Sequence, residues 1–260
     1  MLKHLKELYK FRELLMAFTL REIKVRYKQT ILGASWAILQ PVALTLIFTI
    51  VFGVFLKVKS GTIPYPIFAY SALLPWTFFS TSITFGSLSI VNNGNLISRI
   101  YFPREAMPIA SMGAALFDFL IASIIFILMM FFYHVKISEN ILLLAVIIPT
   151  IVVFTLGISL ILSALNVIFR DIKFIVPLGL QVWLYISPVI YSLNQVPDNI
   201  RKFYIINPMA VLLQSFRDVT VAGSAPNIKE LFLAIVISIS TLIVGYIFFK
   251  HKEKIFADVI

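Results

Sequence analysis

Six long apolar stretches, separated by short polar segments, constrain this chain more than any other feature of its sequence. A stretch of about 20 apolar residues is what an α-helix needs to cross a bilayer. The chain is 60% hydrophobic and 13% charged, whereas soluble domains average about 45–50% and about 25%. A soluble fold of this length could not bury so much apolar surface. The sequence therefore predicts an all-α membrane protein, with one transmembrane domain over residues 1–260.

The boundaries of the predicted helices follow from prolines, turn residues and charges at the ends of the apolar stretches. The six predicted transmembrane helices cover about residues 31–56, 67–91, 108–132, 141–165, 174–193 and 231–249. Pro188 interrupts the fifth stretch, and the chain that follows holds only a short apolar patch. Apolar patches of about 10–14 residues are typical of re-entrant or interfacial segments. We therefore predict short re-entrant helices over residues 194–228, before the last span.

The segment 1–29 is charged and leads directly into the first apolar stretch. Leu5, Leu8 and Leu15 recur on one helical face, and basic residues occupy another. The pattern predicts an amphipathic helix on the membrane surface, although a solvated helix packed on a partner has the same pattern. With the N-terminus inside, 15 of the 22 Lys and Arg residues fall on the inner side. Because basic residues collect on the cytoplasmic side, both termini are predicted to be cytoplasmic and the re-entrant segment to lie outside.

The motifs that carry common catalytic chemistry are missing from the sequence. There is no G-x-x-x-x-G-K-[ST] phosphate loop and no H-E-x-x-H zinc motif, and no G-x-S-x-G nucleophile elbow. The chain has no cysteine, which excludes disulfides and thiolate metal sites. We predict no catalytic residue, metal site or cofactor in this chain. Its net charge of +10 is expected to face membrane lipid and a cytoplasmic partner, with no role for nucleic acid.

Asp118 is the only acidic residue inside a predicted span. An ionisable group at that depth is a functional candidate, because burying it in a membrane is costly. It would serve as the titrating group of a secondary transporter or of an intramembrane enzyme. The other interpretation is a structural side chain that is hydrogen-bonded to a neighbouring helix. We find no inverted repeat of broken helices, which many secondary transporters contain.

Four segments give the chain a family likeness. Residues 21–41 read REIKVRYKQTILGASWAILQP, and residues 99–108 read RIYFPREAMP. The other two segments contain Asn166, Phe169, Arg170 and Asp171, then SPVIYS at 187–192, Val196-Pro197, Asn207-Pro208 and Phe216-Arg217. In these segments the chain resembles the membrane-spanning subunits of type-2 ABC exporters for bacterial surface polysaccharides. Within that family it is similar to the Wzm-type O-antigen permeases, with the TagG-like teichoic acid permeases as a related group.

The resemblance implies a transmembrane permease subunit of an ATP-driven exporter in the bacterial inner membrane. It implies a homodimer that pairs with two copies of a separate nucleotide-binding subunit, on which ATP and Mg²⁺ would bind. The implied substrate is an undecaprenyl-linked polysaccharide such as an O-antigen, moved from the cytoplasmic side. Which sugar the exporter carries is left open. Composition alone also fits a secondary transporter or a channel that is not driven by ATP.

Two groups of charged residues are candidates for function at the cytoplasmic face. The connector 98–107 is expected to form a coupling helix on the ATPase subunit, with polar contacts from Arg99, Arg104 and Glu105. A second group would gather the anionic head of the lipid at the entrance, because Arg and Lys bind phosphate strongly. This group consists of Arg21, Lys24, Arg26 and Lys28. For both groups the alternative is ordinary positive charge on the inner side of the membrane.

Aromatic residues and prolines supply the remaining candidates. Flat aromatic rings suit the apolar faces of sugars, so a polysaccharide path would be lined by Trp36, Tyr70, Trp76, Trp183, Tyr185 and Tyr191. The alternative is an aromatic belt at the membrane interfaces. The predicted outer gate comprises Pro188, Pro197, Asn207 and Pro208, which would break helices where backbone lines a cavity.

Overall fold

The computed structural model describes residues 9–256, except residues 29, 59, 62 and 98. The described part of the chain is helical and contains no strand. Its α-helices are α2 (Arg12–Tyr27), α3 (Trp36–Phe48), α4 (Tyr65–Asn92), α5 (Gly94–Ile97), α6 (Ala106–Phe132), α7 (Leu144–Ile168), α8 (Ile172–Ile186), α9 (Asp198–Ile206), α10 (Pro208–Arg217) and α11 (Ile228–Lys252). The prediction of an all-α protein is therefore confirmed for these residues.

Four helical stretches of the described chain are long and apolar enough to cross a membrane. They are Gly33–Phe55, Ala106–Phe132, Glu139–Ile168 and Ile228–Ile255. Each coincides with a predicted span. The first combines a 3₁₀ turn, α3 and a π-helical stretch. Its Pro41 is tolerated inside α3, where the hydroxyl of Thr45 donates to the Pro41 carbonyl oxygen at 2.8 Å.

The other two predicted spans also form helices, but they differ from these four. Helix α4 has 28 residues and is mostly buried at the centre of the bundle. Helix α8 has 15 residues, so it is about 22 Å long at 1.5 Å per residue. The predicted end of this span at residue 193 is wrong, because the helix ends at Ile186. Ser187 takes an extended conformation before Pro188, as residues that precede proline do.

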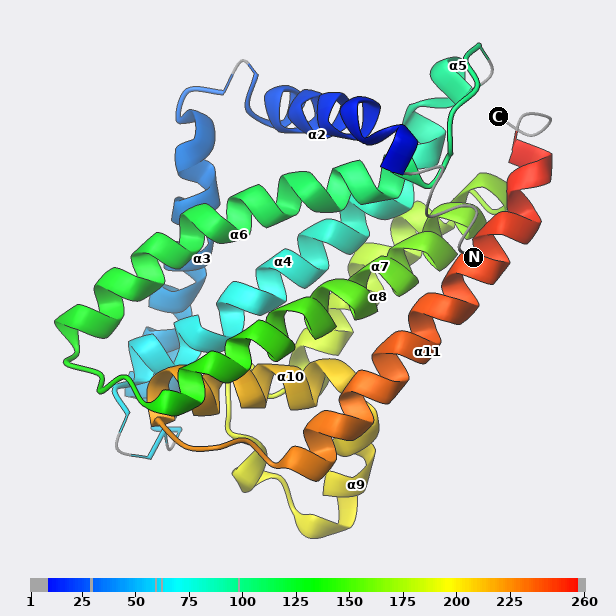
Figure 1. Ribbon diagram of the computed structural model, residues 1–260. Coiled ribbons are helices and arrows are strands. Elements are labelled where there is room, and N and C mark those ends of the chain that lie inside the picture. The colour runs from blue at the N-terminus through cyan, green and yellow to red at the C-terminus, as the bar shows by residue number, and fades with distance from the viewer. Residues whose placement is uncertain (1–8, 29, 59, 62, 98, 257–260) are drawn as a thin grey trace.

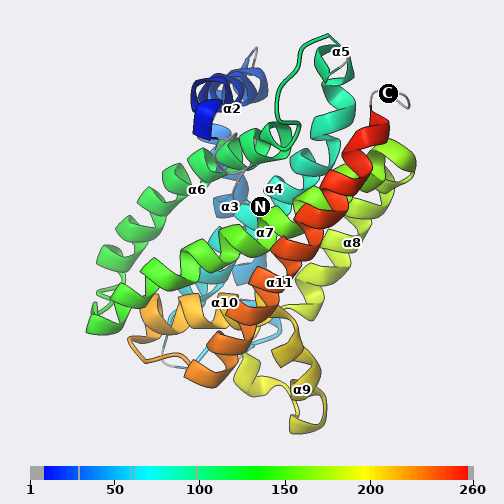
Figure 2. The same ribbon diagram turned by 45° about the vertical axis from the view of Figure 1, so that its right-hand side comes forward.

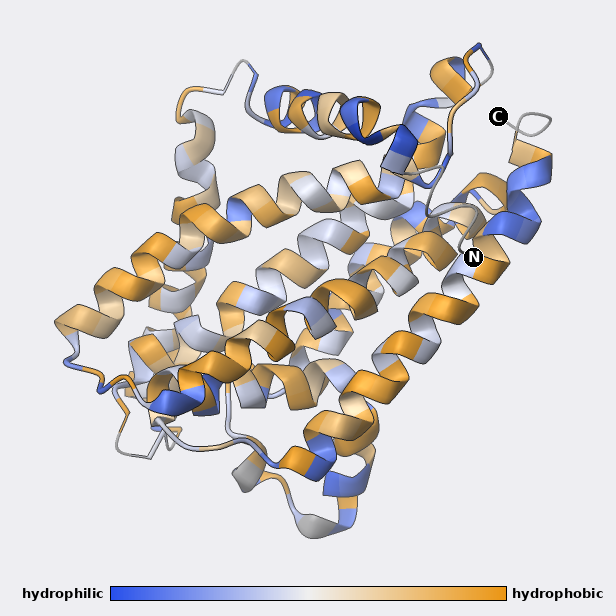
Figure 3. Ribbon diagram, in the orientation of Figure 1, coloured by the Kyte–Doolittle hydropathy of each residue, from blue (hydrophilic) through white to orange (hydrophobic). Residues whose placement is uncertain are grey.

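The long helices run alternately between two ends of the molecule, as Figures 1 and 2 show. At one end lie α2, α5 and the last turns of α11, and at the other lie α9 and α10. Polar residues gather at both ends, and apolar residues fill the helices between them (Figure 3). A belt of apolar surface between two polar ends is what a bilayer requires of a protein that crosses it.

Close backbone contact fixes α11 against α7. A Cβ atom added at Gly245 would lie 2.4 Å from the carbonyl oxygen of Gly157, and one added at Gly157 would lie 2.7 Å from the backbone nitrogen of Leu242. Any side chain at either position would force the helices apart. Small residues allow membrane helices to pack this closely, so both glycines are needed for the observed packing of α11 on α7.

The two short helices begin where the sequence predicts breaks. Helix α9 follows Pro197, and α10 has Pro208 in its first turn. The Asn207 side chain accepts a hydrogen bond from the backbone N–H of Met209 at 3.1 Å. Asn as an N-cap and Pro at the first helical position both favour a helix start, since neither leaves a backbone donor unpaired there.

The predicted surface helix is confirmed as a helix over Arg12–Tyr27, whereas residues 1–8 and 29 lie outside the described part of the chain. Helix α2 lies across the first half of α6 (Figure 1). Phe18 is buried there, and Thr19 packs on Gly113, where an added Cβ would lie 2.9 Å from the Thr19 methyl group. Gly33 then turns the chain into α3 with a φ of +52°, which glycine adopts without strain.

Candidate coupling cluster and entrance cleft

The connector between α4 and α6 does not form the predicted coupling helix. Residues 99–105 are extended or in turns, and Ser98 lies outside the described residues. Pro103 explains the difference, because a proline disfavours helical backbone at the residue before it. That residue, Phe102, is buried and packs on Phe18 with ring centroids 5.4 Å apart. The only helix in this region is the single turn of α5, among the residues that the structure describes.

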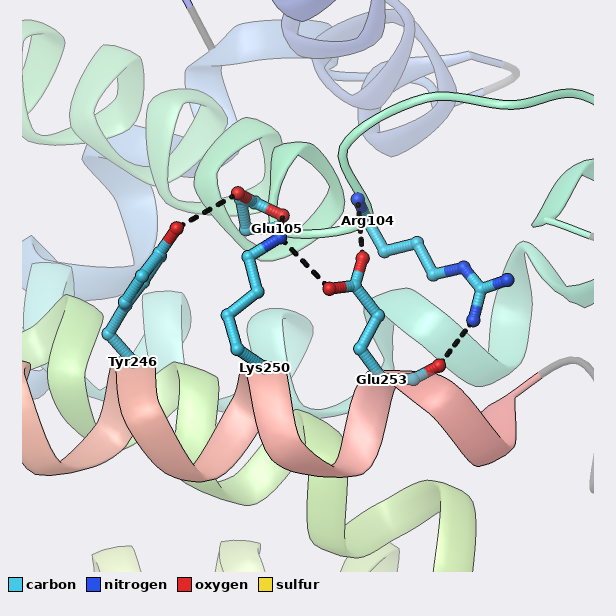
Figure 4. Close-up of polar contacts among 5 residues, drawn as sticks. All are labelled: Arg104, Glu105, Tyr246, Lys250 and Glu253. Carbon is cyan, nitrogen blue, oxygen red and sulfur yellow. Dashed lines mark hydrogen bonds and ion pairs between the residues drawn. The ribbon is translucent and has the colours of Figure 1, made fainter. Parts of the chain in front are cut away.

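Glu105 lies at the centre of a polar cluster that joins the connector to α11 (Figure 4). Its side chain is 1% exposed. The Lys250 ammonium donates to Oε2 of Glu105 at 2.6 Å and to Oε2 of Glu253 at 2.9 Å, and the Tyr246 hydroxyl lies 3.4 Å from Oε1 of Glu105. A buried carboxylate needs such partners, because removing it from water is costly.

Arg104 adds a second link, which joins the connector to Glu253, the residue that directly follows α11. Its guanidinium donates to the backbone carbonyl of Glu253, and its backbone N–H lies 3.4 Å from the Glu253 carboxylate. We call Arg104, Glu105, Tyr246, Lys250 and Glu253 the Glu105 cluster. The three predicted coupling residues are therefore in different environments. Arg104 and Glu105 contact Glu253 and Lys250 of this chain, and Arg99 is exposed.

The four predicted entrance residues also differ in their environments. Arg26 of α2 pairs with Asp118 of α6, and the two side chains are 12% and 19% exposed. The hydroxyl of Tyr27 donates to the other oxygen of Asp118. Burial and this bond to a carboxylate raise the pKa of Tyr27 above its usual value. Both oxygens of Asp118 are thus occupied by α2, which supports the structural interpretation of this residue.

The other basic residues of the entrance group lie apart from Asp118. Arg21 contacts Glu22 at 3.0 Å and hydrogen-bonds the Asn93 side chain, so it ties α2 to the end of α4. Lys24 and Lys28 are exposed. Arg26 is therefore the one member of this group that the structure brings together with the acid of α6.

A cleft of about 430 Å³ opens beside the Arg26–Asp118 pair. Trp36 and Gln40 of α3 line it on one side. On the other side α4 presents a row of hydroxyls at helical spacing: Thr77, Ser80, Thr81 and Thr84. Pockets of about 300–1,000 Å³ are typical of small-molecule sites. Hydroxyls, an amide, an aromatic ring and an ion pair together can bind both polar and apolar faces of a ligand.

The predicted aromatic path is only partly brought together. Trp36 is 47% exposed and lines the cleft. Tyr70 is fully buried and donates to the Ala122 carbonyl at 2.9 Å. Trp76 is also buried, against Phe79. Tyr70 and Trp76 are therefore core residues in this structure.

The remaining aromatic residues lie near the outer segment. Trp183 lines an open groove of about 490 Å³ with residues of α8, α9 and the start of α10. Its indole N–H donates to the Asn207 side chain at 3.1 Å. The hydroxyls of Tyr191 and Tyr204 lie 2.9 Å apart, and Tyr185 is 56% exposed. The predicted gate residue Asn207 thus links α8 to α10.

Arg217 is a buried cation to which the sequence assigned no role. Its side chain is 1% exposed and lies under the loop that contains Pro188. Nη2 donates to the carbonyls of Pro188 and Val189, both at 3.0 Å. Nε donates to the Phe68 carbonyl at 3.3 Å, and the guanidinium lies 3.8 Å from the centre of the Phe68 ring. We call this arrangement the Arg217 cage.

Two signals in the sequence could have drawn attention to these missed residues. Arg217 is the only basic residue between Lys202 and Lys229, in the predicted re-entrant segment, where an ionisable residue marks a candidate site. Lys250 and Glu253 are three residues apart, the spacing of neighbours on one helical face. Across the described residues, no group of three or more His, Asp or Glu is placed to hold a metal ion.

Comparison with known proteins decides the family. A family model described as ABC-2 type transporter matches residues 13–221. This chain belongs to the ABC-2 type transporter family. Members of this family are multi-pass membrane proteins. Each forms the transmembrane subunit of a transporter whose ATPase is a separate chain.

The chain is similar to named members of the family over nearly its whole length. It is 29% identical to the O-antigen export system permease protein RfbA of Myxococcus xanthus, over 99% of both chains. It is 28% identical to the protein of the same name from Klebsiella pneumoniae, over 95% of both. It is 26% identical to the polysialic acid transport protein KpsM of Escherichia coli, over 92% of this chain and 93% of that one.

Proposed function

We propose that this chain is the permease of an ATP-driven exporter of lipid-linked polysaccharide. The observation that carries the proposal is the similarity to the O-antigen export permease RfbA of Myxococcus xanthus across 99% of both chains. The secondary transporter or channel is less well supported, because Asp118 is engaged by Arg26 and Tyr27. The substrate is an undecaprenyl-linked glycan of the O-antigen class.

Six membrane crossings are part of the proposal. Helices α3, α4, α6, α7, α8 and α11 would each cross the bacterial inner membrane. Their alternating direction and the polar residues at both ends support this topology (Figure 3). Both termini would lie in the cytoplasm, as the Lys and Arg distribution predicts. Because α8 is short for a span of about 30 Å, α9 and α10 would complete the outer side as re-entrant helices.

Two copies of the chain would pair with two ATPase subunits, which bind ATP and Mg²⁺. The connector would dock on the ATPase through its outward side chains. Arg99 is exposed there, Ile100 is 56% exposed and Tyr101 is 83% exposed. Aromatic and Arg side chains are common anchors of protein interfaces. Arg104 and Glu105 would act behind this surface.

The cleft beside Arg26 would receive the head of the substrate from the cytoplasmic side, with Arg21, Lys24 and Lys28 adding positive potential around it. Nη2 of Arg26 is buried and has no hydrogen-bond partner among the described residues. A guanidinium can bind a phosphate through two parallel hydrogen bonds. The pyrophosphate of the lipid would therefore share Arg26 with Asp118, and the first sugars would contact Trp36 and the α4 hydroxyls.

The outer gate would be the segment from Pro188 to Arg217. Asn207 and Pro208 fix the start of α10, and the Arg217 cage holds the Pro188 loop against α4. Trp183 contacts this segment through Asn207, and Tyr191 within it donates to the Tyr185 carbonyl. Pro197 sets the start of α9. Movement of these elements would open a path for the glycan.

Export in cells tests the proposed function. Cells that lack this chain should accumulate the lipid-linked glycan inside and lose it from their surface, and the wild-type chain should restore it. Trp36→Ala should lower surface glycan, whereas Leu39→Ala should not, because Leu39 is exposed on the same helix but does not line the cleft. Unchanged surface polysaccharide in cells without the chain would contradict the proposal.

A further inference from the structure

At one end of the molecule, α11 is bound to the connector by charged groups. Lys250 lies in its last turn and Glu253 directly follows it. These two residues contact Glu105 and Arg104, which directly precede α6 (Figure 4). Breaking a buried ion pair by moving one partner away is costly, because the other charge stays buried alone. A displacement of the connector would therefore draw the end of α11 with it.

Partway along its length, α11 packs directly on α7, so the two helices would move together. At the contact between Gly245 and Gly157 there is no space for a side chain at either residue. The helix has 25 residues, so it extends about 38 Å at 1.5 Å per residue. A displacement at one end is consequently carried along the whole helix.

At its other end, α11 begins beside the short outer helices (Figures 1 and 2). Arg201 of α9 lies 3.6 Å from the Glu230 carboxylate. The Asn227 side chain caps α11, accepting from the backbone N–H of Lys229 at 3.1 Å and donating to Glu230 at 2.9 Å. Leu231 and Ala234 are buried on the same side. The helix thus contacts the segment that would form the outer gate.

We propose that α11 is a coupling strut: the Glu105 cluster ties its end to the connector, and the buried residues of its first turns, together with Glu230, hold its start against the outer helices. Lys250 and Glu253 are positioning residues for coupling, since they act through Glu105 and Arg104. Movement that the ATPase imposes on the connector reaches the outer helices along this strut. The inference rests on the proposed function, because it assumes that an ATPase subunit docks on the connector.

A purely structural role for the Glu105 cluster makes a different prediction from a coupling role. Weaker folding would lower the amount of assembled transporter, but each assembled complex would still export the same glycan per ATP. A coupling role instead changes that ratio. The quantity to measure is glycan exported per ATP hydrolysed, in vesicles that contain the assembled complex of this chain and its ATPase subunit.

The test compares charge reversals with their combination. Glu105→Lys and Lys250→Glu should each lower the export ratio about tenfold, within the range that mutations in coupling networks produce. The double exchange, Glu105→Lys with Lys250→Glu, should restore most of it. Lys254→Glu is the matched control, because Lys254 is exposed at the same end of the chain and undergoes the same charge change. Its ratio should equal that of the wild type.

If the charge-reversal variants do not assemble with the ATPase subunit, a milder variant provides the test. Glu253 is 21% exposed, so Glu253→Gln should fold and lower the ratio about threefold. A wild-type ratio in assembled Glu253→Gln, or in both single reversals, would overturn the strut and leave the proposed function intact. A wild-type complex that exports no glycan with ATP would instead contradict the proposed function itself.

Discussion

The two ends of the molecule bury charge in different ways. In the Glu105 cluster, carboxylates are matched by Lys250, Arg104 and Tyr246, which come from the connector and from α11. In the Arg217 cage, one cation is held mainly by backbone carbonyls, which move only if the loop moves. The comparison teaches that the first end is built to join two separate segments of the chain, and that the second is built to hold one loop in place.

The largest expected effect on stability comes from replacing Arg217, the cation of the Arg217 cage. Arg217→Met should lower the free energy of unfolding by about 3–5 kcal/mol, because several buried carbonyls lose their donor. Arg217→Lys should recover only part, since a single ammonium cannot reproduce the geometry of a guanidinium. Chemical unfolding in detergent measures both, with Lys202→Ala as the exposed control. Full stability of Arg217→Met would show that the cage is not a fixed support.

A somewhat smaller effect is expected at the opposite end. Lys250→Met should cost about 3 kcal/mol, because it leaves the buried carboxylate of Glu105 without its cation. The double variant Glu105→Leu with Lys250→Met should be more stable than Lys250→Met alone, since no charge is then left buried without a partner. The same unfolding assay distinguishes them. A double variant less stable than Lys250→Met would show that the cost does not come from an unpaired charge on Glu105.

The Arg26–Asp118 pair is an intermediate case, partly exposed beside the cleft. Asp118→Asn should cost about 1 kcal/mol of stability and should leave the ATPase activity of the complex unchanged. Export should fall severalfold rather than vanish, because Arg26 keeps its charge but loses its orientation. Export and ATP hydrolysis measured in the same vesicles test this. Complete loss of export with intact assembly and ATPase would favour a proton-coupled or enzymatic role for Asp118.

The smallest effect is expected for the outer ion pair. Glu230→Gln should change stability by about 0.5 kcal/mol or less, since the Arg201 side chain is 34% exposed and the pair is 3.6 Å apart. The glutamine can still accept from Asn227. Thermal unfolding in detergent checks the value. A loss as large as that of Lys250→Met would remove the contrast between the two ends.

Much of the fold could be predicted from the sequence because the bilayer imposes simple rules. The lengths of the apolar stretches predicted the long helices. Pro188 indicated the end of α8, Pro197 the start of α9, and Asn207-Pro208 the start of α10. The predicted helix over 98–107 is wrong because Pro103 was given too little weight against the length of the segment. That error concerns local backbone chemistry, which the sequence does contain.

The arrangement of side chains could not be predicted in the same way. In a membrane protein both the core and the lipid-facing surface are apolar, so the pattern does not reveal that Tyr70 and Trp76 are buried while Trp36 lines a cleft. The pairs Glu105–Lys250 and Arg26–Asp118 join residues that are distant in the sequence. Only the packing of helices brings these charges together.

The most direct test of the account is transport by purified protein in vesicles. This chain is co-purified with its ATPase subunit, reconstituted, and supplied with ATP and a lipid-linked O-antigen glycan. We expect a complex with two copies of each subunit, ATP-dependent movement of the glycan, and loss of both ATPase stimulation and movement when Arg99, Ile100 and Tyr101 are replaced by alanine. Failure to bind any ATPase subunit, or glycan movement driven by an ion gradient without ATP, would contradict it.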